Sequence, residues 1–91
     1  MKTLQEFKKE LLSDPEVKKE YDRLAPRYAV ISELIRVRIK NGLTQKELAE
    51  KIGTKQSAIA RLEAGNANPS IGLLEKIAKV TGAKLNITFS A

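Results

Sequence analysis

The chain has 91 residues, a net charge of +6, and neither cysteine nor histidine. This length allows one small domain, and the absent residue types exclude disulfides, thiolate metal sites and the commonest catalytic base. No apolar run reaches the ~18 residues that span a membrane, and the N-terminus lacks the apolar core of a signal peptide. We therefore expect a soluble, cytoplasmic protein without a metal or cofactor.

The first third of the chain predicts amphipathic helices interrupted by proline. Residues 3–12 place their apolar side chains on one helical face. Asp14 followed by Pro15 favours a helix start, because a carboxylate caps free backbone N–H groups and proline has none to satisfy. Pro26 disfavours helical geometry at the residue before it. We expect a break or kink near 24–26 and a new helix from about Pro26 to Asn41.

Two short helices joined by a glycine turn are predicted in the middle of the chain. The run Thr44–Glu47 has the spacing of a capping box at the start of a helix over 45–52. Gly53 allows a sharp turn, and Thr54 is expected to cap a second helix over 55–64. Such a pair predicts a helix-turn-helix, whose second helix enters the major groove of DNA.

The C-terminal part predicts one helix and one strand. Ser70 is placed to cap a helix over 71–81, which Gly82 ends. Residues 83–89 alternate apolar and polar side chains, which is typical of a half-buried strand. Because the chain offers no second strand, we expect pairing with the same strand of a second copy. The apolar side chains of this homodimer contact are Leu85, Ile87 and Phe89.

A longer pattern surrounds the two short helices. It reads Leu34-x-x-Val37-Arg38-x-x-x-Gly42-Leu43-Thr44-Gln45-x-x-Leu48-Ala49-x-x-x-Gly53-x-x-Gln56-Ser57-x-Ile59-x-x-Leu62-Glu63-x-Gly65. With the capped helix that follows, residues 34–82 resemble the lambda-repressor-like, or XRE, helix-turn-helix family. The flanking run Asp14-Pro15-Glu16-Val17 and the ending Gly82-x-x-Leu85-x-Ile87-x-Phe89 are similar to those of HigA-type antitoxins. That resemblance implies a protein that binds a RelE/HigB-like ribonuclease toxin and represses its own operon as an operator-bound dimer.

The resemblance also implies roles for single residues. Gln45 matches a glutamine that bonds a DNA phosphate and braces the recognition helix, while Arg38 and Glu63 match a structural ion pair. Gln56 and Arg61 match base-reading positions, where glutamine suits adenine and arginine suits guanine. Taken alone, each of these two would be an ordinary exposed helix residue. The full set of candidate DNA-binding residues is Thr44, Gln45, Lys55, Gln56, Ser57, Ala60, Arg61 and Asn66.

An apolar stripe near the N-terminus is the candidate toxin-binding surface. RelE-like toxins bind RNA and tend to be positive, so acidic side chains at 16, 20 and 22 would complement one. A stripe that packs on its own bundle or dimer mate would favour a stand-alone transcriptional regulator, whereas an exposed patch would favour a protein partner. An enzyme is rejected, because only carboxylates, lysine and tyrosine remain for catalysis, and ribosome-associated XRE-like coactivators have different flanks. The stripe comprises Leu4, Phe7, Leu11, Val17, Tyr21 and Leu24.

We therefore predict a mainly α fold: a lambda-repressor-like helical bundle with an N-terminal helical extension and one C-terminal β-strand. The expected divisions are an extension at 1–25, a DNA-binding domain at 26–82 and a dimerisation strand at 83–91. Residues 1–22 carry five basic and six acidic side chains, while residues 23–91 carry twelve basic and five acidic ones. The basic excess thus lies with the predicted DNA-binding domain, where neutralising phosphates releases counterions. A solvated surface is the other interpretation of that charge.

Overall fold

The computed structural model describes residues 3–90, and within them it contains five α-helices and no strand. Residues 1–2 and 91, at the ends of the predicted segments 1–25 and 83–91, lie outside the described range. None of the described helices is both long and apolar enough to cross a membrane. In chain order the helices are α1 (Leu4–Ser13), α2 (Pro15–Lys40), α3 (Gln45–Ile52), α4 (Gln56–Glu63) and α5 (Ile71–Thr81).

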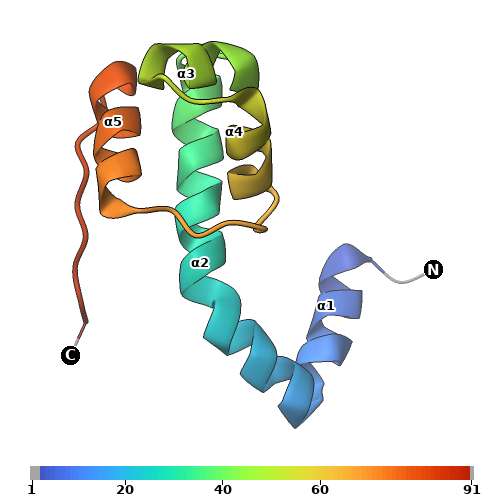
Figure 1. The fold of residues 1–91 in the computed structure, drawn as a ribbon. Coiled ribbons are helices and arrows are strands. Elements are labelled where there is room, and N and C mark those ends of the chain that lie inside the picture. The colour runs from blue at the N-terminus through green and yellow to red at the C-terminus, as the bar shows by residue number, and fades with distance from the viewer. Residues whose placement is uncertain (1–2, 91) are drawn as a thin grey trace.

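The long helix α2 is the axis of the molecule. Its C-terminal half is surrounded by α3, α4 and α5, and α1 folds back beside its N-terminal half (Figure 1). We call residues 3–25, which comprise α1 and the start of α2, the arm. Residues 26–82 are called the body. The predicted boundary between 25 and 26 therefore falls inside one helix.

A single residue joins the two helices of the arm. The backbone N–H of Asp14 donates to the carbonyl of Leu11 at 3.3 Å, which closes α1. The Asp14 carboxylate accepts from the N–H of Glu16 at 2.9 Å, and Pro15 occupies the first turn of α2. The predicted start of a helix at Asp14–Pro15 is confirmed.

The predicted break at Pro26 is wrong, because α2 is continuous from Pro15 to Lys40. A proline inside a helix removes one backbone hydrogen bond and crowds the carbonyl four residues earlier. In α2 the helix on either side of Pro26 is packed, against α1 at one end and against the body at the other. We attribute the survival of the helix to this packing, which outweighs one lost hydrogen bond.

The hydrophobic core lies in the body. Leu48 of α3, Ile59 of α4 and Ile77 of α5 are almost completely buried, at 1–2% exposure. Burying a large aliphatic side chain stabilises a fold by about 1.5–3 kcal/mol. Around these three, the buried cluster is completed by Leu34, Ala49, Leu62 and Leu74. Four helices from separate parts of the sequence thus share one core, and this core positions the helix-turn-helix.

The predicted C-terminal β-strand is not formed. Residues 83–90 are extended without strand pairing, and the backbone bond from Ala83 N–H to the carbonyl of Ala78, 3.0 Å, belongs to the end of α5. A strand exists only when its N–H and C=O groups find a ladder partner, and the described residues offer none. Alternating side chains were therefore insufficient evidence for a strand, and the described fold is all-helical. The segment runs alongside α5 (Figure 1).

Candidate nucleic-acid interface

The first helix of the motif, α3, begins with the predicted capping box. The Glu47 N–H donates to the Thr44 hydroxyl at 3.0 Å, and the Thr44 N–H donates to the Glu47 carboxylate at 3.1 Å. Hydrogen bonding of the Glu47 carboxylate by the backbone N–H and then the side chain of Thr44 lowers the pKa of Glu47 below its ordinary value, because it favours the charged form. The helix spans Gln45–Ile52 as predicted.

Gly53 sets the angle between α3 and α4. Its backbone is left-handed, with φ 76° and ψ 35°, which only glycine adopts without a steric cost. The next N–H, that of Thr54, donates to the carbonyl of Ala49 at 2.9 Å. Ala49 is 1% exposed, so the two helices cross where a larger side chain would not fit. The turn is therefore held by backbone geometry.

The second helix, α4, begins one residue later than predicted. Its N-cap is Lys55 and not Thr54, and no side chain caps it. Lysine has no acceptor to offer, so the structure gives the N–H groups of Gln56 and Ser57 no partner. Free N–H groups at a helix N-terminus are suited to a phosphate. The predicted Thr54 cap is thus wrong, and the uncapped helix start is compatible with a DNA phosphate.

The candidate DNA-reading side chains lie on one face of α4. Residues 56 and 60, and likewise 57 and 61, are four positions apart and therefore share a helical face. The opposite face carries Ile59 and Leu62, which are buried in the core. Gln56, Ser57 and Arg61 are exposed and Ala60 is half-buried.

The remaining candidates flank that face. Lys55, just before α4, and Asn66, just after it, are exposed, and the Asn66 N–H donates to the Arg61 carbonyl at 2.9 Å. Thr44 is exposed and Gln45 half-buried at the start of α3. The candidates thus come from the start of α3, from α4 and from the loop that follows it.

A buried carboxylate holds the recognition helix in place. Glu63, at the end of α4, accepts from Arg38 Nε at 2.6 Å and Nη2 at 2.9 Å, and from Gln45 Nε2 at 3.0 Å. The Arg38 and Glu63 side chains are only 14% and 8% exposed. The structure thus contains the implied Arg38–Glu63 ion pair, and Gln45 bonds the same carboxylate. The phosphate contact of Gln45 stays a prediction. Sequence reasoning missed that Arg38 Nη1 also donates to the Leu43 carbonyl at 2.8 Å, since no sequence pattern marks a backbone carbonyl.

The family model described as helix-turn-helix matches residues 34–87, more than half of the chain. The chain belongs to this helix-turn-helix family. Its members include proteins named as HTH-type transcriptional regulators, so the chain is placed among DNA-binding regulators and not among enzymes.

Relatives of this helix-turn-helix protein occur in bacteria, archaea and eukaryotes. An uncharacterized HTH-type transcriptional regulator of Haemophilus influenzae is 35% identical over 82 residues, 90% of this chain and 80% of that protein. One of Archaeoglobus fulgidus is 46% identical over 52 residues, 57% of this chain and 74% of that protein. The HTH-type transcriptional regulator PuuR of Escherichia coli is 39% identical over 57 residues, 63% of this chain and 31% of PuuR. No solved structure gives a significant match.

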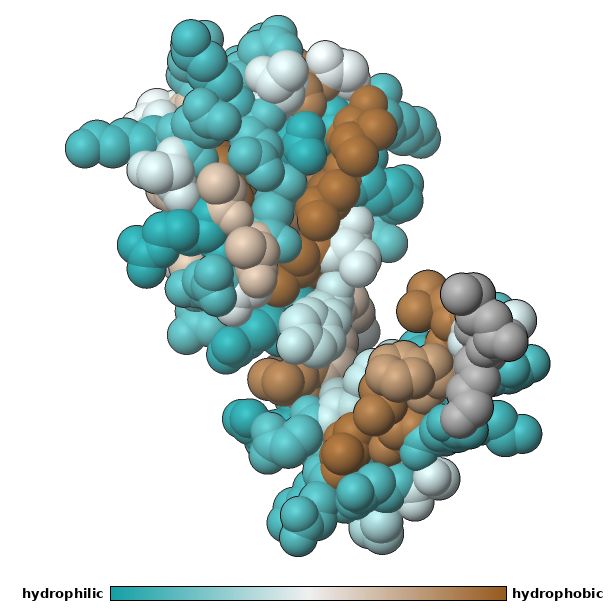
Figure 2. All heavy atoms as spheres, turned by 90° about the vertical axis from the view of Figure 1, so that its right-hand side faces the viewer, coloured by the Kyte–Doolittle hydropathy of each residue, from teal (hydrophilic) through white to brown (hydrophobic). Residues whose placement is uncertain are grey.

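The candidate toxin-binding residues lie outside the helix-turn-helix match, on the arm. Leu4 is 83% exposed and Phe7 is 52% exposed. Leu11, Val17 and Tyr21 are exposed to a smaller extent, and Leu24 is half-buried. Figure 2 shows apolar side chains gathered on one face of the arm, in the lower part of the picture. The candidate residues are therefore exposed or half-buried on the arm.

The candidate dimerisation residues lie on the extended C-terminal segment. Leu85 and Ile87 are partly to largely exposed, and Phe89 is fully exposed. The described residues form no β-strand, so these side chains do not belong to a sheet within the chain. Their contact with a second copy stays a prediction.

Proposed function

We propose that this helix-turn-helix regulator is the antitoxin of a toxin–antitoxin pair. In this proposal the arm binds a RelE/HigB-like ribonuclease toxin, and a dimer of the body binds operator DNA and represses the operon that encodes both proteins. The arm and the body thereby have separate partners.

The exposed apolar stripe of the arm carries the proposal. In a self-sufficient regulator the apolar faces of the two arm helices would be covered by the chain's own bundle or by its dimer mate. Here α1 packs on α2, yet no residue of α1 is buried. Contiguous exposed apolar surface on a small protein marks an interaction site. A protein partner that covers Leu4 and Phe7 accounts for this surface.

Acidic side chains beside the stripe would face a basic toxin, although most of them already have a basic partner on α2. Two of the three acids expected to face a basic toxin are already paired on α2, since Lys18 bonds Asp22 at 2.8 Å and Arg23 bonds Glu20 at 2.7 Å. Exposed pairs of this kind contribute little to stability, and their carboxylates can exchange one cation for another. Tyr21 lies beside them, with the Lys8 ammonium 5.0 Å from its ring centre.

On the DNA side, the proposal assigns base reading to Gln56 and Arg61 and phosphate binding to Gln45 and Lys55. The first two are exposed on the outer face of α4, where the major groove would meet them. The latter two stand at helix starts, where backbone N–H groups and the helix dipole favour a phosphate.

The test is capture of the partner by a tagged full-length chain in its native cell. We expect the wild type to retain a small ribonuclease-like protein, identified by mass spectrometry, and to rescue growth when that protein is overproduced. Leu4→Asp with Phe7→Asp should lose both properties while binding the operator normally. The control is Ile71→Asp, an apolar position on α5 whose exposure of 61% lies between those of Phe7 and Leu4, and this variant should keep both.

A stand-alone transcriptional regulator is the second candidate. It is favoured by the relatives, which are named as transcriptional regulators. Absence of any retained companion, together with normal operator binding, would support this candidate and contradict the antitoxin. Retention of the companion by the doubly substituted arm would move the toxin site elsewhere on the chain.

A further inference from the structure

The loop that leaves the recognition helix lies against α2. Residues 64–70 run from the end of α4 across α2 to the start of α5 (Figure 1). A methyl group built onto Gly65 would lie 3.7 Å from Ile31 Cδ1 and 4.0 Å from Tyr28 Cε1, two side chains of α2. Because glycine has no side chain, the backbone of the loop itself lies beside these two side chains.

Backbone hydrogen bonds fix where this loop begins. The Gly65 N–H donates to the Leu62 carbonyl at 3.1 Å, and the Asn66 N–H donates to the Arg61 carbonyl at 2.9 Å. With the left-handed φ of 82° at Gly65, these bonds form a Schellman motif at the end of α4. The residue after the glycine frequently adds an apolar contact to such a motif. Here that residue is the polar Asn66, so apolar support for the loop has to come from elsewhere.

The side chains of α2 provide this support. Ile31 is only 6% exposed although it stands outside the core cluster, so its burial depends on other surroundings, which include Gly65. Tyr28 is 47% exposed, and its hydroxyl makes no hydrogen bond within the described residues. A buried tyrosine hydroxyl normally has a partner. In Tyr28, therefore, the ring makes the contact with the loop and the hydroxyl does not contribute.

Asn66 follows this contact directly. Its side chain is exposed, and its amide has no hydrogen-bond partner in the part of the chain that the structure describes. Asparagine side chains are among the groups that donate to DNA phosphates. Residues 64–70 carry no acidic side chain that would repel a phosphate.

We propose that Tyr28 is a positioning residue for DNA binding and that it acts through Asn66. The Tyr28 ring supports Gly65 from the side of α2, while the Schellman bonds tie Gly65 to the end of α4. The loop then presents the Asn66 amide to a phosphate of the duplex whose bases α4 reads. A phosphate contact of this kind fixes the position of the protein on the duplex and does not read its sequence.

This inference rests on the DNA-binding side of the proposed function and not on the toxin. Fluorescence anisotropy with a duplex that covers the promoter of the chain's own operon tests it. We expect Tyr28→Ala to weaken binding about tenfold, the scale of one hydrogen bond to a charged group. Tyr28→Phe keeps the ring and should bind within about twofold of the wild type. A Tyr28→Phe protein as weak as Tyr28→Ala would overturn the proposal, because the hydroxyl would then be the active group.

A double-mutant cycle separates positioning from an independent contribution of Tyr28. Asn66→Ala should weaken binding about as much as Tyr28→Ala. The double variant should bind no more weakly than Asn66→Ala alone, because residues that act through one contact do not have additive effects. Additive losses, or wild-type affinity of Tyr28→Ala, would contradict the proposal.

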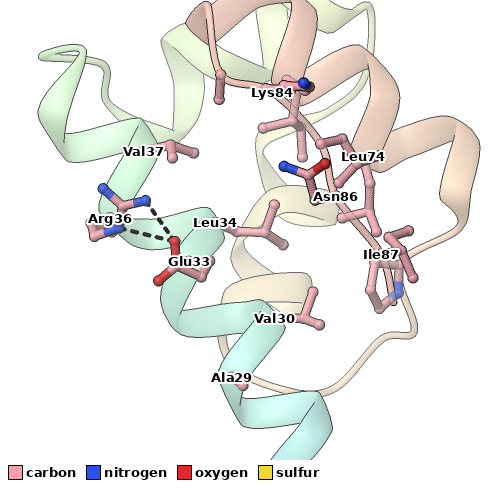
Figure 3. Close-up of a pocket in the computed structure, with 15 residues that line it drawn as sticks. Ala29, Val30, Glu33, Leu34, Arg36, Val37, Leu74, Lys84, Asn86 and Ile87 are labelled. Atoms are coloured by element: carbon pink, nitrogen blue, oxygen red, sulfur yellow. Dashed lines mark hydrogen bonds and ion pairs between the residues drawn. The ribbon is translucent and has the colours of Figure 1, made fainter. Parts of the chain in front are cut away.

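Val30 provides the matched control on the same helix. It lies two residues after Tyr28, is 36% exposed, and lines a cavity of about 540 Å³ between α2, α5 and the C-terminal segment (Figure 3). It is not among the side chains within 4 Å of the methyl position at Gly65. Val30→Ala should therefore leave DNA binding unchanged, and an equal loss from Val30→Ala and Tyr28→Ala would show that α2 acts only through general stability.

Amide hydrogen exchange tests the contact without DNA. In Tyr28→Ala the Asn66 N–H should exchange at least severalfold faster, because the support of its loop is lost. The Leu48 N–H, which donates to the Thr44 carbonyl in α3, should keep its rate. An unchanged Asn66 rate, or equal acceleration at both amides, would overturn the proposal. A failure of the toxin experiment or of base reading by α4 would leave this result as it stands.

Discussion

The arm and the body are built from the same kind of amphipathic helix, but their apolar faces meet different surroundings. In the body, Leu48 and Ile59 are covered by neighbouring helices and are 1% exposed. In the arm, Leu4 also belongs to the apolar stripe of its helix, but it is 83% exposed. A pair of helices forms one layer, and its outer apolar face has no second layer to pack against. Periodicity thus predicts that a helix has an apolar face, and not what covers it.

The ion pairs of the two regions differ in the same way. Arg38 and Glu63 join helices that are far apart in the sequence, and both side chains are mostly buried. The arm has Lys18–Asp22 and Glu20–Arg23, which are local to one helix and largely exposed. The other described ion pair of the body, Glu33–Arg36, is local and exposed like those of the arm. Arg38–Glu63 is therefore the pair that holds tertiary structure together. The predictions below separate the two regions further.

The largest contrast is expected in DNA binding. Gln56→Ala with Arg61→Ala should weaken binding to the promoter of the chain's own operon, with each lost base contact costing about 1–3 kcal/mol. Lys8→Ala with Lys9→Ala, two exposed cations of the arm, should have little effect on sequence-specific binding. Fluorescence anisotropy measures the affinity, and circular dichroism checks the fold. Equal losses from both double variants would show that general charge, and not α4, dominates recognition.

A smaller contrast is expected in stability. Arg38→Ala leaves the buried Glu63 carboxylate without its main partner, so it should lower the free energy of unfolding by about 3 kcal/mol. Arg23→Ala breaks a pair that solvent already screens and should leave the free energy unchanged within error. Urea unfolding of both variants measures the two free energies of unfolding. A wild-type curve for Arg38→Ala would mean that the pair contributes nothing to the fold.

The smallest effect concerns the capping box of α3. Hydrogen bonds from Thr44 lower the pKa of Glu47 in the folded state. Stability from a lowered carboxylate pKa is present above the unfolded-state pKa and is lost as pH falls through the folded-state value. Glu47→Gln keeps the hydrogen-bonding pattern but does not titrate. The melting temperature of the wild type should therefore fall more steeply than that of Glu47→Gln between about pH 5 and pH 3. Parallel curves would contradict this assignment.

Local chemistry let the sequence determine two elements of the body, α3 and α5. The Thr44–Glu47 spacing and Gly53 delimit α3, and the Ser70 hydroxyl, which accepts from the Leu73 N–H at 3.1 Å, starts α5 as expected. These signals act within four residues, so no distant contact is needed to interpret them. The pairing of Arg38 with Glu63 was also available beforehand, although through family resemblance and not through spacing.

Tertiary structure decided everything that depends on what surrounds a segment. Pro26 breaks a helix in isolation, but packing on both sides keeps α2 continuous. Residues 83–89 alternate like a strand, but a strand needs a ladder partner that the described chain does not contain. The exposure of Leu4 and Phe7 likewise depends on what packs against the arm and not on the apolar pattern of its helix. Hydrogen bonds between residues a few positions apart can be predicted from the sequence. Burial cannot, because it depends on surfaces brought together from distant parts of the chain.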